Sequence, residues 1–233
     1  MRAAGRLDRW LGILPDLLFM GIIVMAAGAW FAQVGAQGSI SVLPFTLLGW
    51  GVFVAIIGSA SHIRSFTPAD RVTLGRVMLL ILLSALLLGA NASQVDVGLV
   101  FALAMAVALL DAVDGAIARR LNCVRPFGAR FDMEVDAAML LIFSLWLLAL
   151  GRAGFWVLLI GLWRYVFVLA GQFFPTLRAP LPFSQRRRVI CGIQGVGLAV
   201  CLAPGMLSTV SAPIAAGLLL LLSYSFMVDI FRR

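Results

Sequence analysis

The sequence contains little charge and no lysine. Only 12% of its 233 residues are charged, whereas 63% are hydrophobic. An ordinary soluble domain has about 25% charged and about 45–50% apolar residues. A soluble chain of this length has too little interior to hide so much apolar surface. The scarcity of charge therefore excludes an ordinary soluble protein and indicates that much of the surface faces lipid.

Cysteine and histidine are scarce as well, and their spacing is not that of metal ligands. The three cysteines form no C-x-x-C pair and lie in or beside apolar segments, where cysteine is usually a small apolar filler: Cys123, Cys191 and Cys201. His62, the single histidine, lies in a short polar loop without a ligand-spaced partner. A zinc site, which would need such ligands, is therefore not indicated.

Long apolar runs are what the sequence has in abundance. Segments of about 17–25 apolar residues, the length that crosses a bilayer as a helix, recur along the chain. They lie at about 12–33, 41–61, 72–89, 97–118, 130–150, 154–174, 188–204 and 208–230. The runs are continuous rather than alternating, which argues against a membrane barrel of strands. We predict an all-α, polytopic membrane helix bundle, in which Pro15 and Asp16 leave room for an interfacial helix at the start of the first run.

The basic residues are all arginines, and their placement predicts the orientation of the bundle. Of the 18, all but two lie in the termini and in alternate loops or at the adjoining span ends; the exceptions are Arg152, in an opposite loop, and Arg164, inside an apolar run. By the positive-inside rule, both termini face the cytoplasm. Arginines that punctuate loops fit contact with anionic lipid head groups and do not indicate nucleic acid as a partner.

Acidic residues are rare, yet half of the ten lie between residues 111 and 136. Asp111 and Asp114 are three apart on one predicted helix, and Asp132 and Asp136 are four apart on the next, so each pair shares a helix face. Glu134 falls on the other side of its helix. An ionised aspartate at membrane depth costs at least about 2.5–3.5 kcal/mol, and several together repel one another unless a cation lies between them.

Two facing helices are thus expected to present four carboxylates to one gap. Hard oxygen ligands in this number suit Mg²⁺ or Mn²⁺, or Ca²⁺, and four can hold two ions, as in phosphoryl transfer. Gly115, Ala118 and Gly128 leave the backbone open to a bulky ligand, and Arg119 offers a fork for a diphosphate. Alternatively, Gly115 and Ala118 form a small-residue helix contact, and Arg119 is a positive-inside anchor.

The same residues resemble a known motif. DAVDGAIAR at 111–119, followed by Gly128, Asp132 and Asp136, matches the CDP-alcohol phosphotransferase signature D-x2-D-G-x2-A-R-x8-G-x3-D-x3-D at all its fixed positions. The stretch TPADRVTLGR, residues 67–76, also resembles the family's entry to its first core helix, where Asn is usual at the place of Asp70. Asp70 thus adds a carboxylate, and its expected partner is Arg71 or Arg76.

The resemblance covers roughly residues 66–230 and implies both an architecture and an activity. A six-helix catalytic domain would occupy residues 66–233, with about two extra membrane or interfacial helices in residues 1–65. The enzyme would transfer a phosphatidyl or other substituted phosphoryl group from a CDP-alcohol, commonly CDP-diacylglycerol, to an acceptor hydroxyl and release CMP, in phospholipid biosynthesis. It would be a multi-pass protein of a bacterial inner membrane with its active site facing the cytoplasm, and a homodimer is compatible with the family.

The resemblance also implies roles for single residues. The ligands of two Mg²⁺ or Mn²⁺ ions would be Asp111, Asp114, Asp132 and Asp136. Asp136 would also take the proton of the incoming hydroxyl as the catalytic base. The residues that seat the CDP part would be Thr73, Gly115, Ala118, Arg119 and Gly128.

The acceptor is less well defined by the sequence. Arg164 lies mid-span, where an unpaired charge is costly, and is either a structural partner of a buried carboxylate or an anion contact for the acceptor or the donor diphosphate. Arg187, in the basic run 186–188, either binds an acceptor phosphate or anchors its span. Two basic sites would suit glycerol 3-phosphate, and hence a phosphatidylglycerophosphate synthase. Serine, an inositol phosphate and other alcohols stay open as acceptors.

The distribution of the acidic residues disfavours two other classes of protein. A small transporter would spread its charges along the bundle axis and carry an inverted repeat, but the acids concentrate at one face and no repeat is visible. The loss of one of the four aspartates would indicate a structural membrane protein that keeps the motif without turnover, but all four are present.

Overall fold

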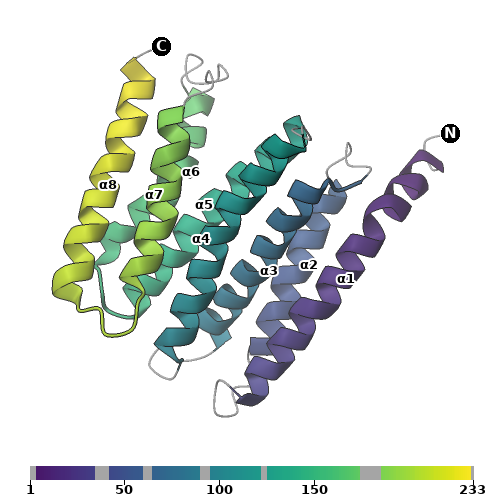
Figure 1. Cartoon of the computed structure of the whole chain (residues 1–233), viewed down its shortest axis with the longest axis horizontal. Helices are drawn as coiled ribbons and strands as arrows, with labels where there is room; N and C mark the ends of the chain where they lie inside the picture. Colours follow the sequence, from purple (N-terminus) through teal and green to yellow (C-terminus); the bar gives the residue numbers. More distant parts are fainter. Residues whose placement is uncertain are drawn as a thin grey trace.

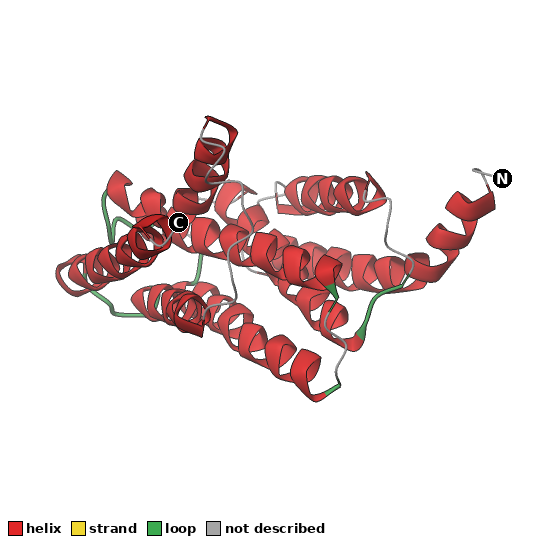
Figure 2. Ribbon diagram, turned by 90° about the horizontal axis from the view of Figure 1, so that it is seen from above, coloured by secondary structure: helices red, strands yellow, loops and turns green. Residues whose placement is uncertain are grey.

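The computed structural model describes residues 4–34, 42–59, 65–89, 95–121, 125–173 and 185–231. Over these residues the chain forms eight α-helices and one 3-10 turn, and no strand, which confirms the prediction of an all-α bundle (Figure 2). The helices are α1 (Ala4–Val34), α2 (Val42–Ser59), α3 (Pro68–Gly89), α4 (Val97–Arg120), α5 (Pro126–Ala149), η1 (Phe155–Val157), α6 (Leu158–Phe173), α7 (Gln185–Cys201) and α8 (Ser208–Phe231).

The helices run alternately up and down through the bundle, so that the start of α1 and the end of α8 lie at the same end (Figure 1). Helix α3 lies in the middle of the packing, because it contacts α1, α2, α4 and α5. Helix α7 packs against α4, α5 and α8. Consequently the start of α3, the end of α4, the start of α5 and the start of α7 come together at one end of the molecule, which we call the upper end.

Within the described ranges, four helical segments are long and apolar enough to cross a bilayer: Gly12–Phe31, Pro68–Gly89, Val97–Ile117 and Ser208–Val228. Three shorter apolar helices, Val42–Gly58, Phe155–Ala170 and Val189–Cys201, fall below that length. The remaining predicted span corresponds to α5, whose first half carries three acidic residues. All eight predicted spans therefore coincide with helices, and four of them have the length and hydropathy of a full span. Helix α1 runs through Pro15 without a break.

The helices that carry the acidic residues begin at defined capping signals. At α3, Asp70 Oδ2 accepts from the Thr67 amide at 2.8 Å, while Thr67 Oγ1 accepts from the Asp70 amide at 3.2 Å, a reciprocal cap. At α4, Asp96 accepts from the Gly98 amide at 2.8 Å. Helix α5 begins with Pro126, which suits the first helical position because its missing N–H would be unpaired there.

Below the acidic region the bundle is held by close apolar packing. The largest buried side chain is Trp146, whose Nε1 donates to the Leu83 carbonyl at 3.1 Å and joins α5 to α3. A Cβ at Gly161 would lie 2.3 Å from the Leu141 Cα, so only glycine allows α6 to approach α5 this closely. These contacts fix α5 against α3 and α6 below the site.

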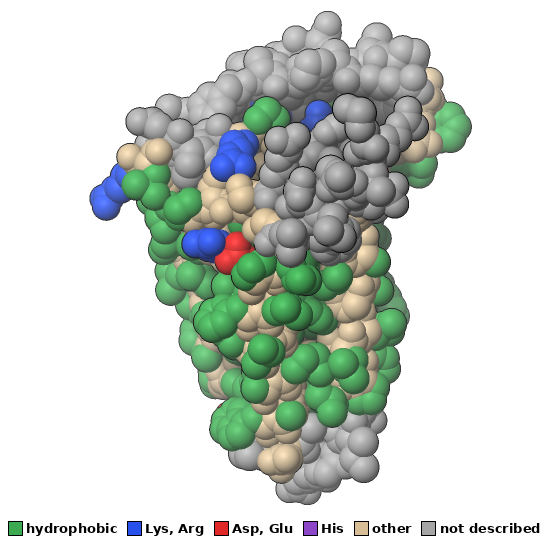
Figure 3. All heavy atoms as spheres, turned by 90° about the vertical axis from the view of Figure 1, so that its right-hand side faces the viewer, with side chains coloured by type: hydrophobic (Ala, Val, Ile, Leu, Met, Phe, Trp, Pro, Cys, Tyr) green, Lys and Arg blue, Asp and Glu red, His purple; other side chains and the backbone are tan. Residues whose placement is uncertain are grey.

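The surface agrees with a membrane environment. On the face shown in Figure 3, hydrophobic side chains cover the middle and lower parts, and the coloured arginine and acidic side chains lie toward the upper end. Large apolar side chains are exposed along α1, among them Leu18, Phe19 and Ile22. Lipid, rather than water, is the solvent that such a surface requires.

Candidate active site

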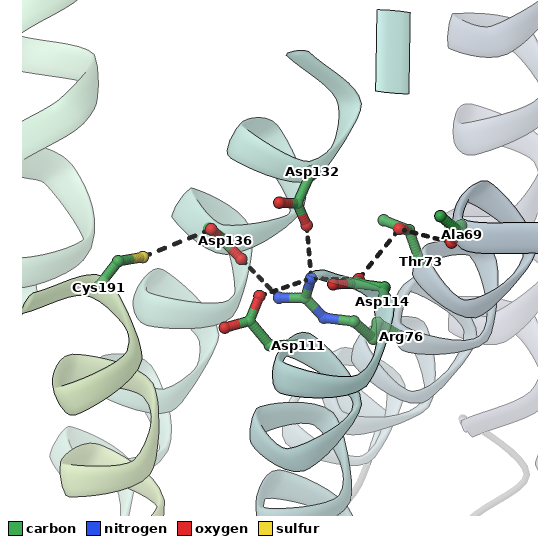
Figure 4. A network of polar contacts seen from close by, with 8 residues as sticks. All are labelled: Ala69, Thr73, Arg76, Asp111, Asp114, Asp132, Asp136 and Cys191. Atoms are coloured by element: carbon green, nitrogen blue, oxygen red, sulfur yellow. Dashed lines mark hydrogen bonds and ion pairs between the residues drawn. The ribbon is translucent and has the colours of Figure 1, made fainter. Parts of the chain in front are cut away.

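Four aspartates from two helices face one another at the upper end of the bundle. Asp111 and Asp114 come from the second half of α4, and Asp132 and Asp136 from the first half of α5. Asp114 is buried, and the other three are half-buried. Because α4 runs upward into α5, which runs downward, both pairs meet at the same height beside the start of α3 (Figure 4).

Three of the carboxylates form a compact set of oxygen donors. One ligand atom from each of Asp111, Asp114 and Asp132 can be chosen so that all lie within 4.8 Å of one another. Asp136 lies outside this set among the described residues. An all-carboxylate set of this kind fits a hard divalent cation such as Mg²⁺ or Mn²⁺ and does not fit zinc. The observed residues therefore fit the metal that the motif implies.

A buried arginine from α3 lies at the centre of the four carboxylates. Arg76 Nη1 is 3.0 Å from Asp111 Oδ1, 3.0 Å from Asp114 Oδ2 and 2.7 Å from Asp132 Oδ1. Its Nη2 is 2.5 Å from Asp136 Oδ1 (Figure 4). The Arg76 side chain is 0% exposed. One guanidinium thus carries the positive charge that a cluster of carboxylates needs.

Arg76 was not predicted to belong to the site and was counted among the residues that orient the bundle. The signal was present, because Arg76 lies inside the predicted span 72–89 and one turn after Thr73. A charge at that depth requires a partner, and the neighbouring helices hold a surplus of carboxylates.

Thr73 lies on the same face of α3 as Arg76 and touches the same cluster. Its Oγ1 is 3.1 Å from Asp114 Oδ2 and 3.2 Å from the Ala69 carbonyl oxygen. The hydroxyl has a single proton and donates to one of these two oxygens at a time. Thr73 was predicted to contact the CDP part. Its observed contact is with an aspartate of the acidic cluster, which it helps to orient.

Helix α7 closes the site from the side opposite α3. Cys191 Sγ lies 3.4 Å from Asp136 Oδ2, so the two oxygens of this carboxylate are contacted from two helices (Figure 4). One turn further on, Gly195 faces α5, where a Cβ would lie 2.8 Å from Met139 Cε. Cys191, expected to be an apolar filler, therefore contacts the site, and no spacing in the sequence could have indicated this.

Asp70 pairs with neither of the two arginines expected as its partners. Its carboxylate caps α3 through the Thr67 amide, whereas Arg71 Nε pairs with Asp16 Oδ1 on α1 at 3.0 Å. The other Asp70 oxygen faces Gly128, where a Cβ would lie only 2.7 Å from Asp70 Oδ1. The open backbone at Gly128 is thus occupied by a side chain of α3.

The remaining predicted residues are distributed around this cluster. Gly115 follows Asp114 and is half-buried. Ala118 and Arg119 belong to the last turn of α4, but their side chains lie outside the described residues. Arg187 is half-buried in the first turn of α7.

Arg164 has a partner outside the aspartate cluster. Its Nη2 forms an ion pair with Glu134, an exposed residue of α5 that points away from the four aspartates by helical phase. Arg164 was expected either to pair with a buried carboxylate or to bind an anion. It pairs with a carboxylate, but with one that is exposed at the surface. Its Nε is buried and has no hydrogen-bond partner among the described residues.

The fold and the site together define a helical membrane protein with a carboxylate centre suited to a divalent cation. Residues 66–228 match the model of the CDP-alcohol phosphatidyltransferase family, and the chain belongs to this family. Its members are enzymes of phospholipid synthesis that act on a CDP-alcohol and a hydroxyl acceptor and are generally metal-dependent. Neither the curated proteins nor the solved structures yielded a match to the chain.

Proposed function

We propose that the protein transfers the phosphatidyl group of CDP-diacylglycerol to a hydroxyl of glycerol 3-phosphate and releases CMP, as a phosphatidylglycerophosphate synthase does. The observation that carries the proposal is the set of three carboxylates within 4.8 Å of one another, inside the segment that matches the family. A phosphorylated acceptor is favoured because Arg187 adds a cation in the first turn of α7, which packs against the helix that carries Asp132 and Asp136.

Two Mg²⁺ or Mn²⁺ ions would be held by Asp111, Asp114 and Asp132, with Asp136 contributing. When bound, such ions neutralise the diphosphate and stabilise the charge of the departing CMP. The three first-named carboxylates are the ones whose oxygens already lie close together. Asp136 differs from them because its two oxygens are contacted separately, by Arg76 and by Cys191.

In the reaction that we propose, Asp136 acts as the base. The acceptor oxygen attacks the phosphorus that bears the diacylglycerol group, while the bond from this phosphorus to the CMP oxygen breaks. CMP leaves with the electron pair of that bond, and the hydroxyl proton passes to the Asp136 carboxylate. A carboxylate can do this only within hydrogen-bond reach of the hydroxyl. Asp136 keeps 17% of its side chain exposed, so it is not sealed inside the bundle.

The CDP part would bind between the ends of α3, α4 and α5. Gly115, Ala118, Arg119 and Gly128 are the residues proposed to seat it, and Thr73 would act through Asp114. Arg119 would supply the charged fork for the diphosphate. Because Asp70 lies against Gly128, the nucleotide would meet both of these residues at the start of α5.

We further propose that the upper end of the bundle faces the cytoplasm of a bacterial inner membrane. Among the described residues, arginines lie at the starts of α3, α5 and α7 at this end, which supports the orientation that the positive-inside rule predicts: Arg71, Arg125, Arg130, Arg186 and Arg187. Donor and product are lipids, whereas CMP and glycerol 3-phosphate are water-soluble, so a site at the membrane surface serves both. Residues 1–65 would then form membrane helices outside the catalytic domain of residues 66–233.

The variant Asp136→Asn tests the proposed base. It keeps the shape of the side chain and removes the proton acceptor, so CMP release should fall by about 10²–10⁴-fold, the range of general-base catalysis. Binding of CDP-diacylglycerol, measured by equilibrium binding to the purified protein, should stay within a few-fold of wild type. Near-normal CMP release by this variant would show that another group takes the proton.

The acceptor is tested by a panel. CMP release from CDP-diacylglycerol is measured with glycerol 3-phosphate, serine, inositol phosphate and free glycerol, each at the same concentration. Glycerol 3-phosphate should give the fastest release, and Arg187→Gln should raise its KM more than it lowers kcat. Faster release with serine, or with an alcohol that lacks phosphate, would contradict the acceptor while leaving the reaction class intact.

A further inference from the structure

Among the described residues, Arg76 is the one side chain that contacts all four aspartates. It does so without any exposure to solvent, and it reaches them from α3, a third helix beside the two that carry the acids. The cluster therefore has four negative groups and one positive group. An arrangement in which the carboxylates faced one another with no cation between them would be strongly repulsive.

The guanidinium stands where a cation bound by the same carboxylates would have to lie. Nη1 is within 3.0 Å of oxygens from each of Asp111, Asp114 and Asp132, the three residues whose ligand atoms lie within 4.8 Å of one another. A Mg²⁺ ion needs its oxygen ligands at about 2.0–2.1 Å. The oxygens cannot surround both Nη1 and such an ion, and the two positive charges would repel each other.

The arginine is also incompletely satisfied in this position. Its Nε is buried and has no hydrogen-bond partner among the described residues. A guanidinium has five N–H donors, and a buried donor without an acceptor costs free energy. Arg76 is therefore held in the cluster by its four charged partners, while one of its five donors stays unused. A divalent cation, which carries more charge, could replace it there.

We propose that Arg76 is the resident counter-ion of the acidic site and competes with the divalent cation for Asp111, Asp114 and Asp132. Without metal, the guanidinium holds the carboxylates of α4 and α5 together and keeps the upper end of the bundle folded. When the cation binds, the Arg76 side chain gives up these contacts. The inference rests on the proposed metal site and adds that metal loading exchanges one cation for another.

The test measures metal binding and not turnover. The full chain is purified in detergent, and Mn²⁺ binding is titrated by electron paramagnetic resonance of the free ion for wild type, Arg76→Gln and Arg76→Lys. Removing the competitor should tighten Mn²⁺ binding by about tenfold or more in Arg76→Gln, because an occupied site lowers the apparent affinity by the fraction that is free. Arg76→Lys should fall between the other two, since an ammonium keeps the charge but cannot reach all four carboxylates at once.

A matched control is Arg152→Gln, which removes another buried arginine, one whose partners are backbone carbonyls at the other end of the bundle. It should destabilise the protein and leave Mn²⁺ affinity unchanged. Thermal unfolding without and with Mn²⁺ gives the second measurement. Arg76→Gln should unfold at a lower temperature than wild type without Mn²⁺, and the difference should shrink at saturating Mn²⁺.

The outcomes separate the inference from the proposed function. Mn²⁺ binding that is unchanged or weaker in folded Arg76→Gln overturns the competition and makes Arg76 a scaffold for the carboxylates. If Arg76→Gln does not fold even with Mn²⁺, Arg76→Lys decides, and affinity no tighter than wild type overturns the proposal. If neither wild type nor any variant binds Mn²⁺, the proposed metal site itself is wrong.

Discussion

Two arginines, Arg76 and Arg152, are buried at opposite ends of the bundle and have different partners. Arg76 is surrounded by four carboxylates. Arg152, 8% exposed, follows α5 and donates through Nη1 to the carbonyls of Cys201 at 2.8 Å and Ala203 at 2.9 Å. Cys201 is the last residue of α7, where the last carbonyls of a helix lack partners within it and favour a cation, and Ala203 lies in the turn that follows.

The partners of each buried arginine indicate its role. Arg152 joins the turn after α5 to the end of α7, and Ser211 Oγ donates to the Arg152 carbonyl at 2.9 Å to complete the junction. Its partners are neutral and belong to the backbone, so no ligand of the reaction would replace it. The partners of Arg76 are ionisable side chains that suit a metal, so its place can be taken by another cation. We therefore expect Arg152 to stabilise the lower end and Arg76 to exchange with a bound cation at the upper end.

The largest expected effect comes from changing the partners of Arg76. Asp132→Asn removes one carboxylate of the three-member set and should lower CMP release by about 10²–10³-fold, the range for losing one electrostatic element of a transition state. Asp16→Asn is the charge-matched control, because Asp16 pairs only with the exposed Arg71 in an ion pair worth at most about 1 kcal/mol. The rate of CMP release by purified protein checks both variants. Equal losses in the two variants would mean that the acidic cluster has no special role.

The second effect concerns the arginine at the lower end. Arg152→Met removes the donor of the buried Cys201 carbonyl and one of the two donors of the Ala203 carbonyl, which should lower the free energy of unfolding by about 1–3 kcal/mol. CMP release per folded molecule should stay close to wild type. Thermal unfolding, combined with activity below the unfolding temperature, checks this. A large loss of activity without a loss of stability would contradict the purely structural role of Arg152.

The smallest effect is expected from the hydroxyl that touches the cluster. Thr73→Val removes the contact with Asp114 and should lower kcat about tenfold, the equivalent of one hydrogen bond to a charged group. Thr73→Ser keeps the hydroxyl and should restore most of the activity. Steady-state kinetics with varied CDP-diacylglycerol separates kcat from KM. A change confined to the donor KM would instead support a direct contact between Thr73 and the nucleotide.

Much of the fold could be predicted from the sequence, because apolar runs of membrane length leave few alternatives to a helix. The eight predicted runs coincide with the eight helices of the described residues. The hydrophobic pattern could not tell whether α1 continues through Pro15. The neighbouring helix contributes here, because Asp16 pairs with Arg71 on α3.

The carboxylates of the site could be predicted because their spacing places each pair on one face of its helix. Their mutual repulsion also indicated that a cation lies between them. Helical phase also separated Glu134 from the four aspartates. Of the partners that come from other helices, the sequence indicates only that Arg76, a charge inside a predicted span, needs a partner, and it indicates nothing for Cys191. Arg76 and Cys191 reach the cluster only because α3 and α7 pack on α4 and α5, and sequence periodicity contains no information on which helices pack together.

The most direct test of the account is the metal dependence of CMP release. The purified full chain in liposomes receives CDP-diacylglycerol and glycerol 3-phosphate, and released CMP is measured before chelation, after EDTA, and after Mg²⁺ or Mn²⁺ is added back. We predict that release stops with EDTA, returns with the divalent cation, and stays absent in Asp136→Asn throughout. CMP release that continues unchanged after chelation, or none with any acceptor when the cation is present, would contradict a metal-dependent phosphatidyltransferase site at these aspartates.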